Sequence, residues 1–285
     1  MLLRQMQIPP WGALGLNSGV QDADNLVWKL SLALRHPEMN LENLLQSYDA
    51  ERRPIGERVG KTSLINMQSH ALILDKAIGL SPKNSEEANM RAMQQYFDPA
   101  DAKEGLRKRN EVARALKELD IEFYAHGAEV GWFYDLPYQT CYSVQSPVNP
   151  QVKSDGTMEL CEYRPTTRPG SQLPHAWVRN DSTGEQRSTR ELPEGDKLLL
   201  LAFWPAWKDF EHPLLVQEII GPGQRWQLQE DHLIEQFHGV LDGGALIVRP
   251  DRIIAFRFED NTMLGRSNPH ELATTIVNRI LRLES

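Results

Sequence analysis

The sequence predicts an α/β (α+β) chain, in which a helical first half precedes a smaller domain of strands and helices. In the first half, between residues 22 and 122, apolar residues recur at helical spacing. Residues 137–165 are rich in Pro, Ser and Asn, as linkers are. After them come an apolar run, a hairpin pattern and a final helical pattern. We therefore expect domains at 1–136 and 166–285 with a linker at 137–165.

The stretch Pro9–Leu30 is typical of a helix start that faces an anion or an electron-rich ring. Two prolines hold the entering chain extended, and three glycines permit close approach and unusual backbone dihedrals. Asn17 or Ser18 can then cap a helix. The first turn of that helix presents free N–H groups and the positive end of its dipole. The alternative is an ordinary Gly/Pro loop before a core helix, because such loops are common.

The same stretch is similar to the last FAD-binding motif of the class A flavoprotein aromatic hydroxylases, the family of the phenol and 2,4-dichlorophenol monooxygenases. The shared pattern is Pro-Pro-x-Gly-x-x-Gly-Leu-Asn-x-Gly-x-Gln-Asp-Ala-x-Asn-Leu-x-Trp-Lys-Leu. By this resemblance, Gly12, Gly15, Leu16 and Asn17 are cofactor-binding residues. The backbone of the last three is expected to lie against the pyrimidine edge of the flavin, where it favours the anionic flavin.

The resemblance also assigns Pro10 and Trp11 to the border of the substrate cavity, because the carbonyl of the matching proline lies next to the bound phenol in the family. Gln21, Asp22 and Asn25 match recurrent polar positions of the motif. For these three residues, both cofactor contact and capping or packing of the helix start stay open. No catalytic residue is assigned, since the base for the phenol usually comes from a part of the family that this sequence does not match.

Three further segments resemble the same family. Ser47–Pro54 is similar to its Tyr-x-x-Glu-Arg-Arg-Pro segment, for which we expect a structural role. Tyr163–Val178 contains the Arg-Pro-Gly-x-x-x-Pro-His-x-Trp signature that opens the C-terminal domain of the phenol hydroxylase branch. Gly243–Arg257 is similar to the Gly-Ala-x-Leu-Val-Arg-Pro-Asp segment, and its apolar first strand predicts burial on both faces.

The resemblance makes the first half a helical remnant of the flavin hydroxylase domain and the end a thioredoxin-like domain. Helices are predicted at 22–35, at 41–53 before Pro54 interrupts or kinks the run, at 63–77 and at 102–122. After the linker we expect, in order, a strand (197–204), a helix (213–220), a hairpin (244–249 and 252–258) and a closing helix (269–283). Thioredoxin-like folds have this order. Without paired cysteines, the domain is expected to serve packing or dimerisation.

An aromatic-rich cluster closes the helical half, with Tyr124, His126, Trp132, Phe133 and Tyr134. These side chains can line a cavity or pack in the core. We favour core packing, because large aromatic side chains contribute most by being buried.

Composition argues against several classes of function. The net charge of -8 and the pI near 5.5 disfavour a nucleic-acid partner, and the basic residues of Lys103–Arg114 are interspersed with acids as on a solvated helix face. The longest apolar run, Leu198–Trp207, contains Pro205 and is too short to span a bilayer. The N-terminus lacks the pattern of a secretion signal, so a cytoplasmic location is expected.

Cysteines and histidines give no sign of a metal site. Cys141 and Cys161 form no Cys-x-x-Cys motif, which argues against a disulfide framework or a zinc ribbon. The eight histidines show no ligand spacing. We therefore expect no metal.

By resemblance, the function is that of an FAD-dependent monooxygenase that hydroxylates a phenolic or aromatic substrate with NAD(P)H and O2, as a homodimer in the intact family member. Met1–Ile8 do not match the family's Gly-Asp segment, and no Gly-x-Gly-x-x-Gly turn is present. We therefore expect the C-terminal portion of such an enzyme, with poor affinity for FAD on its own and exposed apolar surface. The alternative is a non-catalytic binding or dimerisation protein derived from such an enzyme.

Overall fold

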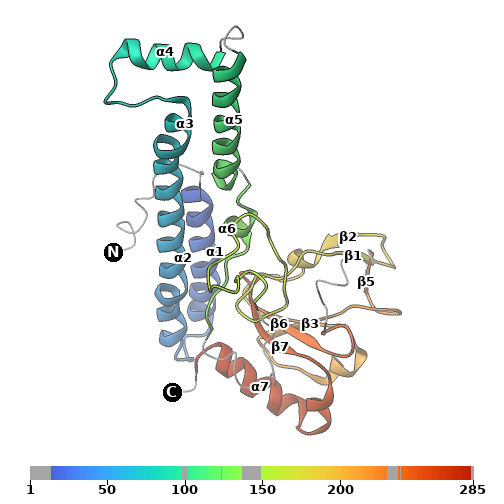
Figure 1. Ribbon diagram of the computed structural model, residues 1–285. Helices are drawn as coiled ribbons and strands as arrows, with labels where there is room; N and C mark the ends of the chain where they lie inside the picture. Colours follow the sequence, from blue (N-terminus) through green and yellow to red (C-terminus); the bar gives the residue numbers. More distant parts are fainter. Residues whose placement is uncertain are drawn as a thin grey trace.

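The computed structural model describes residues 14–97, 102–122, 124–136, 149–229, 237 and 239–283. A column of helices stands beside a smaller unit that holds two sheets and a C-terminal helix (Figure 1). The predicted mixed α/β class, with helices first and strands after them, is confirmed.

The helical half contains α1 (Leu14–Arg35), α2 (Glu42–Ser69), α3 (Lys76–Ile78), α4 (Glu86–Phe97), α5 (Ala102–Glu118) and α6 (His126–Val130). Helices α1 and α2 pack along each other, and α4 and α5 lie at the far end of the column (Figure 1). A π-helical segment, His70–Asp75, joins α2 to α3. Gly79, with a φ of 93°, ends α3 in the left-handed region, which glycine adopts at low cost. A 3-10 turn, Leu119–Glu122, follows α5.

The predicted start of the first helix is wrong. Helix α1 begins at Leu14 rather than at Asp22, so Asn17 and Ser18 lie within its first turns and do not cap it. Glycines lower helix propensity and so favour a later start in a sequence-based prediction. Burial of Leu14 and Ser18 against the rest of the fold offsets this cost.

Pro54 does not interrupt the second helix. Helix α2 runs through it to Ser69 and absorbs the helix predicted from residue 63. An internal proline costs about 3 kcal/mol because it removes a hydrogen bond and crowds the preceding turn. Glu51 and Ile55, on either side of Pro54, are buried, and their tertiary contacts keep the backbone helical. Helix α4 is an element that the sequence analysis did not predict, whereas the helix expected from 102 is confirmed by α5.

The C-terminal half contains two sheets. Strands β1 (Trp177–Asn180), β2 (Gln186–Ser188) and β5 (Trp226–Leu228) form an antiparallel sheet in the order β2-β1-β5. The second sheet has the order β4-β3-β6-β7 and consists of β3 (Leu198–Ala202), β4 (Leu215–Ile219), β6 (Ala245–Val248) and β7 (Ile254–Phe258). Strands β3 and β4 are parallel, and the other neighbours are antiparallel. Among the described residues, 3-10 turns also occur at Thr189–Glu191, Pro205–Asp209 and Thr262–Gly265.

The helix predicted at 213–220 is wrong, because this segment forms strand β4. Its Leu, Gln and Glu residues have good helix propensity, but Val216 and Ile219 are β-branched and favour a strand. Pairing with β3 decides the outcome. The other predicted elements are confirmed by β3, by the hairpin of β6 and β7, and by α7 (Pro269–Ile280).

The second sheet separates two apolar cores. Along β3, Leu198 and Leu200 face the core that also contains Trp28, Ile55 and the apolar side of α7. Leu199 and Leu201, which alternate with them along β3, face the core between the two sheets. All residues of β3, β6 and β7 are buried, which confirms the burial predicted for the apolar hairpin strand.

Segment 149–165, the described part of the predicted linker, is tied to the rest of the chain. The side chain of Gln151 is buried, donates to the carbonyl of Glu162 (2.8 Å) and accepts from the backbone N–H of Arg164 (3.0 Å). Cys161 is a free, exposed thiol, and Cys141 lies outside the described residues. Among the described helices, none is long and apolar enough to cross a membrane.

Candidate functional site at the start of helix α1

A cavity of about 260 Å³ lies at the first turns of α1. Helix α1 contributes Leu14, Asn17, Ser18 and Gln21, and the opposite wall comes from α2, from the segment of α6 and from Trp132. The N–H groups of the first helical turn have no carbonyl partner within a helix. The described first turn of α1 contains no acidic side chain, so none of its own side chains compensates the positive end of the helix dipole. The cavity therefore adjoins a place suited to negative charge.

The predicted cofactor residues lie partly at this cavity. Gly15, Leu16 and Asn17 belong to the first turn of α1, and Asn17 lines the cavity. A Cβ atom added at Gly15 would meet no described atom within 4 Å, so this backbone is open to close approach. The remaining predicted site residues lie outside the described residues: Pro10, Trp11 and Gly12.

Arg52 of α2 holds the first turns of α1 in place. Its Nε donates to Asp22 Oδ1 (2.6 Å), and its Nη2 donates to the carbonyl of Ser18 (3.3 Å) and to Gln21 Oε1 (3.4 Å). Its Nη1 donates to the hydroxyl of Tyr134 (3.1 Å). One buried guanidinium thus fixes both the backbone and the side chains that border the cavity. For Asp22 and Gln21, packing of the helix start is what this structure supports.

Glu51, the neighbour of Arg52, lies at the centre of a second buried cluster. It accepts two hydrogen bonds from Arg249 (2.9 Å each) and one from Lys29 Nζ (3.0 Å). Asn25 Nδ2 also donates to Glu51 Oε2 (2.8 Å) and to Asp251 Oδ2 (3.2 Å). Arg249 and Asp251 belong to the turn between β6 and β7, so this cluster joins the helical half to the sheet half.

Burial and neighbouring charges shift the pKa values of several groups in these clusters, among them Lys29, Glu51 and Tyr134. Burial, with Arg249 next to it, lowers the pKa of Lys29 to about 8. Burial opposes ionisation of Glu51, but the charges of Arg249 and Lys29 outweigh it and hold the Glu51 pKa well below its usual range. Burial raises the pKa of Tyr134, so its hydroxyl is neutral and accepts from Arg52.

Sequence reasoning identified part of this arrangement. The structural role expected for Ser47–Pro54 agrees with Glu51 and Arg52, which are its buried charged residues. The roles of Lys29, Arg249 and Asp251 were missed. Asn25 and Lys29 are polar residues four positions apart, and this spacing places them on one helix face, which could have indicated a buried polar pair.

The sequence left open whether the aromatic cluster lines a cavity or packs in the core, and the structure shows both. Trp132 and Tyr134 are buried in the core, as favoured, and Trp132 also lines the cavity at α1. Tyr124 is exposed.

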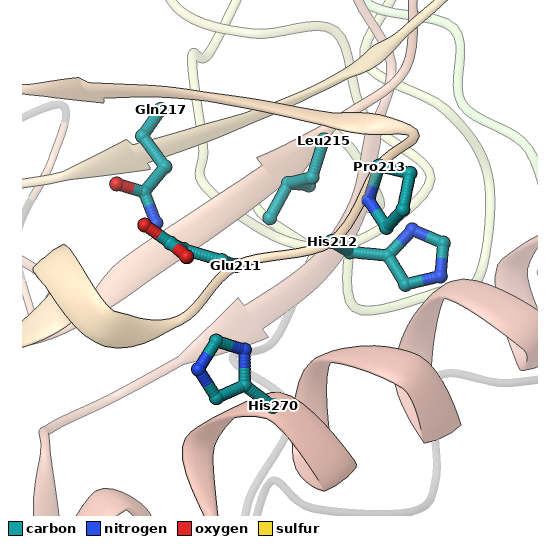
Figure 2. A pocket seen from close by; sticks show the side chains of 6 residues that line it. All are labelled: Glu211, His212, Pro213, Leu215, Gln217 and His270. Atoms are coloured by element: carbon teal, nitrogen blue, oxygen red, sulfur yellow. The ribbon is translucent and has the colours of Figure 1, made fainter.

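A larger hollow of about 530 Å³ lies between β4 and the start of α7, lined by Glu211, His212, Pro213, Leu215, Gln217 and His270. Figure 2 shows the side chains of Glu211 and His212 extending in opposite directions. His212 Nδ1 accepts from the backbone N–H of Leu214 (3.1 Å), and burial lowers its pKa. Across the described part of the chain, no group of three His, Cys, Asp or Glu side chains could hold a metal ion. This hollow therefore has no assembled set of ligands.

Comparison with known proteins points to the α1 site. A sequence model of the FAD binding domain family matches residues 7–63, which include all of α1 and most of α2. The 2,4-dichlorophenol 6-monooxygenase of Cupriavidus pinatubonensis (strain JMP 134 / LMG 1197) is 30% identical over 286 aligned residues, which cover 96% of this chain and 44% of that protein. Phenol 2-monooxygenase of Pseudomonas sp. (strain EST1001) is 31% identical over 264 aligned residues, which cover 87% of this chain and 40% of that protein.

The chain belongs to the class A FAD-dependent hydroxylase family. The crystal structure of the flavin-dependent monooxygenase PieE in complex with FAD and substrate has a TM-score of 0.76 to this chain at 27% identity, and the match covers 98% of this chain and 46% of PieE. Aklavinone-11 hydroxylase, solved with FAD and aklavinone, shares the fold at a TM-score of 0.57 and 22% identity. This chain spans less than half the length of these relatives of the hydroxylase family.

Proposed function

We propose that this chain forms part of an FAD-dependent hydroxylase of phenolic or other aromatic substrates, in which the first turn of α1 faces the flavin. The observation that carries the proposal is the cavity beside the described first turn of α1, which carries no acidic side chain, within the segment that matches the FAD binding domain family. The named relatives act on dichlorophenol and phenol, which supports a phenolic substrate class.

The residues of α1 fit a flavin at this position. Backbone N–H groups of Gly15, Leu16 and Asn17 would donate to the pyrimidine edge of the ring and stabilise negative charge on it. Gly12 is proposed as a further cofactor-binding residue, and Pro10 and Trp11 as the border of the aromatic substrate. FAD, reduced by NAD(P)H, would supply the activation of O2, while this chain orients the rings and excludes water.

For the C-terminal part, we propose a thioredoxin-like domain over 166–285 that serves packing or dimerisation. The order β4-β3-β6-β7, with one parallel pair and a closing helix, supports this proposal. The domain contains no cysteine, which argues against dithiol chemistry. We propose a homodimer, which is the assembly that the family resemblance suggests, and a cytoplasmic location, which follows from the lack of a secretion-signal pattern in the sequence.

The test is the visible absorption spectrum of the purified chain after incubation with FAD and removal of free FAD. Retained flavin supports the proposal, and its affinity is expected to be low. Leu16→Asp places a carboxylate in the first turn and should weaken flavin binding about fivefold relative to Leu16→Asn, because it repels an anionic ring. Equal binding by the two variants would contradict the proposed contact.

An activity test joins this chain to the part of the Cupriavidus pinatubonensis relative that it does not match. Hydroxylated product from phenol, NADPH and O2 would support the proposed reaction. A chimera that folds and retains FAD but forms no product from any phenol would favour the non-catalytic alternative.

A further inference from the structure

A continuous series of buried side chains connects the turn between β6 and β7 to the first turns of α1. It passes from Arg249 through Glu51 and Asn25 to Tyr134, and from there to Arg52. Its two ends lie far apart in sequence, and each consecutive pair is joined by a side-chain hydrogen bond of 3.3 Å or less.

The C-terminal end of this series is fixed by a bidentate ion pair. Both terminal nitrogens of Arg249 donate to Glu51 (2.9 Å each), and its Nε donates to Asp251 Oδ1 (2.9 Å). A guanidinium held by two carboxylates has one allowed orientation, so distance and angle between the turn and α2 are both set.

The middle of the series is Asn25, which is 1% exposed. Its Nδ2 lies within hydrogen-bonding distance of Glu51 Oε2 (2.8 Å) and of the Tyr134 hydroxyl (3.3 Å), while its Oδ1 accepts from Lys29 Nζ (2.9 Å). Lys29 in turn donates to Ser47 (2.8 Å). Hydrogen bonds at both Nδ2 and Oδ1 therefore fix the orientation of the Asn25 amide.

The N-terminal end is Arg52, which contacts Ser18, Gln21 and Asp22. Ser18 and Gln21 line the cavity at α1, one turn after Gly15. A shift of the Arg52 guanidinium would thus move the backbone that carries the flavin-facing amides.

Stability alone does not explain this arrangement. Replacing a buried ionic group by packed apolar residues is often neutral or stabilising, so charges in a core contribute mainly direction and register. Apolar packing would tolerate small slides of α1 against the sheet half, whereas hydrogen bonds between charged groups lose strength steeply when they are misaligned.

We propose that Arg249, Tyr134 and Arg52 are positioning residues that transmit the placement of the β6–β7 turn to the flavin-facing first turn of α1. This inference rests on the proposed function for its link to flavin, although the mechanical coupling is measurable without it.

Backbone amide hydrogen exchange of the full chain, resolved by mass spectrometry, tests the coupling. The variants are Arg249→Lys, which removes the bidentate geometry and keeps the charge, and Tyr134→Phe, which removes one hydroxyl. Their matched controls are Arg164→Lys, whose exposed ion pair is with Glu162 rather than with a residue of α1, and Tyr124→Phe, an exposed tyrosine. The amides of residues 18–25 report on the first turns of α1.

We expect exchange of residues 18–25 to rise about tenfold in both variants, which is the effect of one lost hydrogen bond to a charged group, with a clearly smaller rise in α7 and no change in the controls. A rise spread equally over the whole chain would overturn the proposal, because it means that these residues only stabilise the fold in general. No rise in α1 would also overturn it, because it means that the turn and α1 are not coupled.

The FAD spectrum is the second measurement. If wild type retains flavin, Arg249→Lys should shift the bound flavin spectrum and weaken binding, although Arg249 lies in the opposite half of the chain from α1. Bound spectra and affinities identical to wild type would contradict the positioning role. If wild type retains none, this chain does not hold flavin by itself, the chimera decides the proposed function, and the exchange pattern alone decides the coupling.

Discussion

Lys29 has no exposed surface, and each hydrogen of its ammonium group has an acceptor among Asn25, Ser47 and Glu51. The cations Lys29, Arg52 and Arg249 pair with the anions Asp22, Glu51 and Asp251, and Arg282 Nη2 lies 3.8 Å from Glu51 Oε1. In such a cluster, removal of Glu51 leaves its buried partners without compensation.

Glu51→Gln is therefore expected to destabilise the chain by about 3–5 kcal/mol, because Lys29 and Arg249 then repel each other in the core. Urea unfolding measures the loss. The matched control is Asp49→Asn on the same helix, whose ion pair with Arg53 is exposed and is worth less than about 1 kcal/mol. Similar losses for the two variants would contradict the assigned importance of the buried cluster.

The lowered pKa of Lys29, about 8 against 10.5 for a free lysine, predicts a pH dependence of stability. Between these values the unfolded chain binds more protons than the folded chain, so the contribution of Lys29 to the free energy of unfolding rises with pH, by about 3 kcal/mol over the full window. The charged groups that face Lys29 are Glu51, Arg249 and Asp251. In urea unfolding from pH 7 to 10, Lys29→Met should remove this rise, whereas Lys61→Met, at an exposed position of α2, should retain it.

At the scale of the element, helix α1 buries several polar side chains and exposes several apolar ones, the reverse of the usual arrangement in a surface helix. Its buried residues include Ser18, Asn25 and Lys29, whereas apolar side chains are exposed along the opposite face. These exposed residues follow one another at intervals of three, four or seven: Leu16, Val20, Val27, Leu30 and Leu34. The exposed apolar surface expected from the sequence is present on this helix.

We expect this apolar face to bind a hydrophobic fluorescent dye. A Val27→Gln/Leu34→Gln variant should bind clearly less dye while its thermal stability is retained, since both positions are exposed and glutamine is a good helix former. Lys61→Gln on α2 is the control. Undiminished dye binding in the double variant would locate the apolar surface elsewhere.

Elements with strong local patterns were predictable, and those that depend on distant partners were not. The apolar hairpin of β6 and β7 and the helix α7 were identified, because burial and capping are encoded within each segment. Strand β4 was mistaken for a helix, since only its pairing with β3 fixes it. Near the described start of α1, the carbonyl of Ser18 accepts from Arg52, which lies on another helix.

At the scale of the molecule, the two halves share one apolar core and one buried ionic cluster. They are therefore expected to unfold together, with helix and sheet signals changing in a single transition.

Acid should weaken this connection through Glu51. Its pKa is lowered in the folded chain, so its stabilising effect is complete above about pH 4.5, the value of a free glutamate, and is lost as the pH falls below that value. Urea unfolding between pH 6 and 3 should show a decline that is smaller in Glu51→Gln. An equal decline in both proteins would assign acid sensitivity to other carboxylates.

The sequence by itself determined the family, the order of helices before strands, and the segment that carries the flavin motif, because these follow from local patterns of residues. Only the tertiary structure decided which charges meet. Lys29, Glu51 and Arg249 are separated by many residues, and no local periodicity relates them. Their contact depends on how the sheet half packs against α1 and α2, since burial makes a charge dependent on whichever partners the fold brings to it.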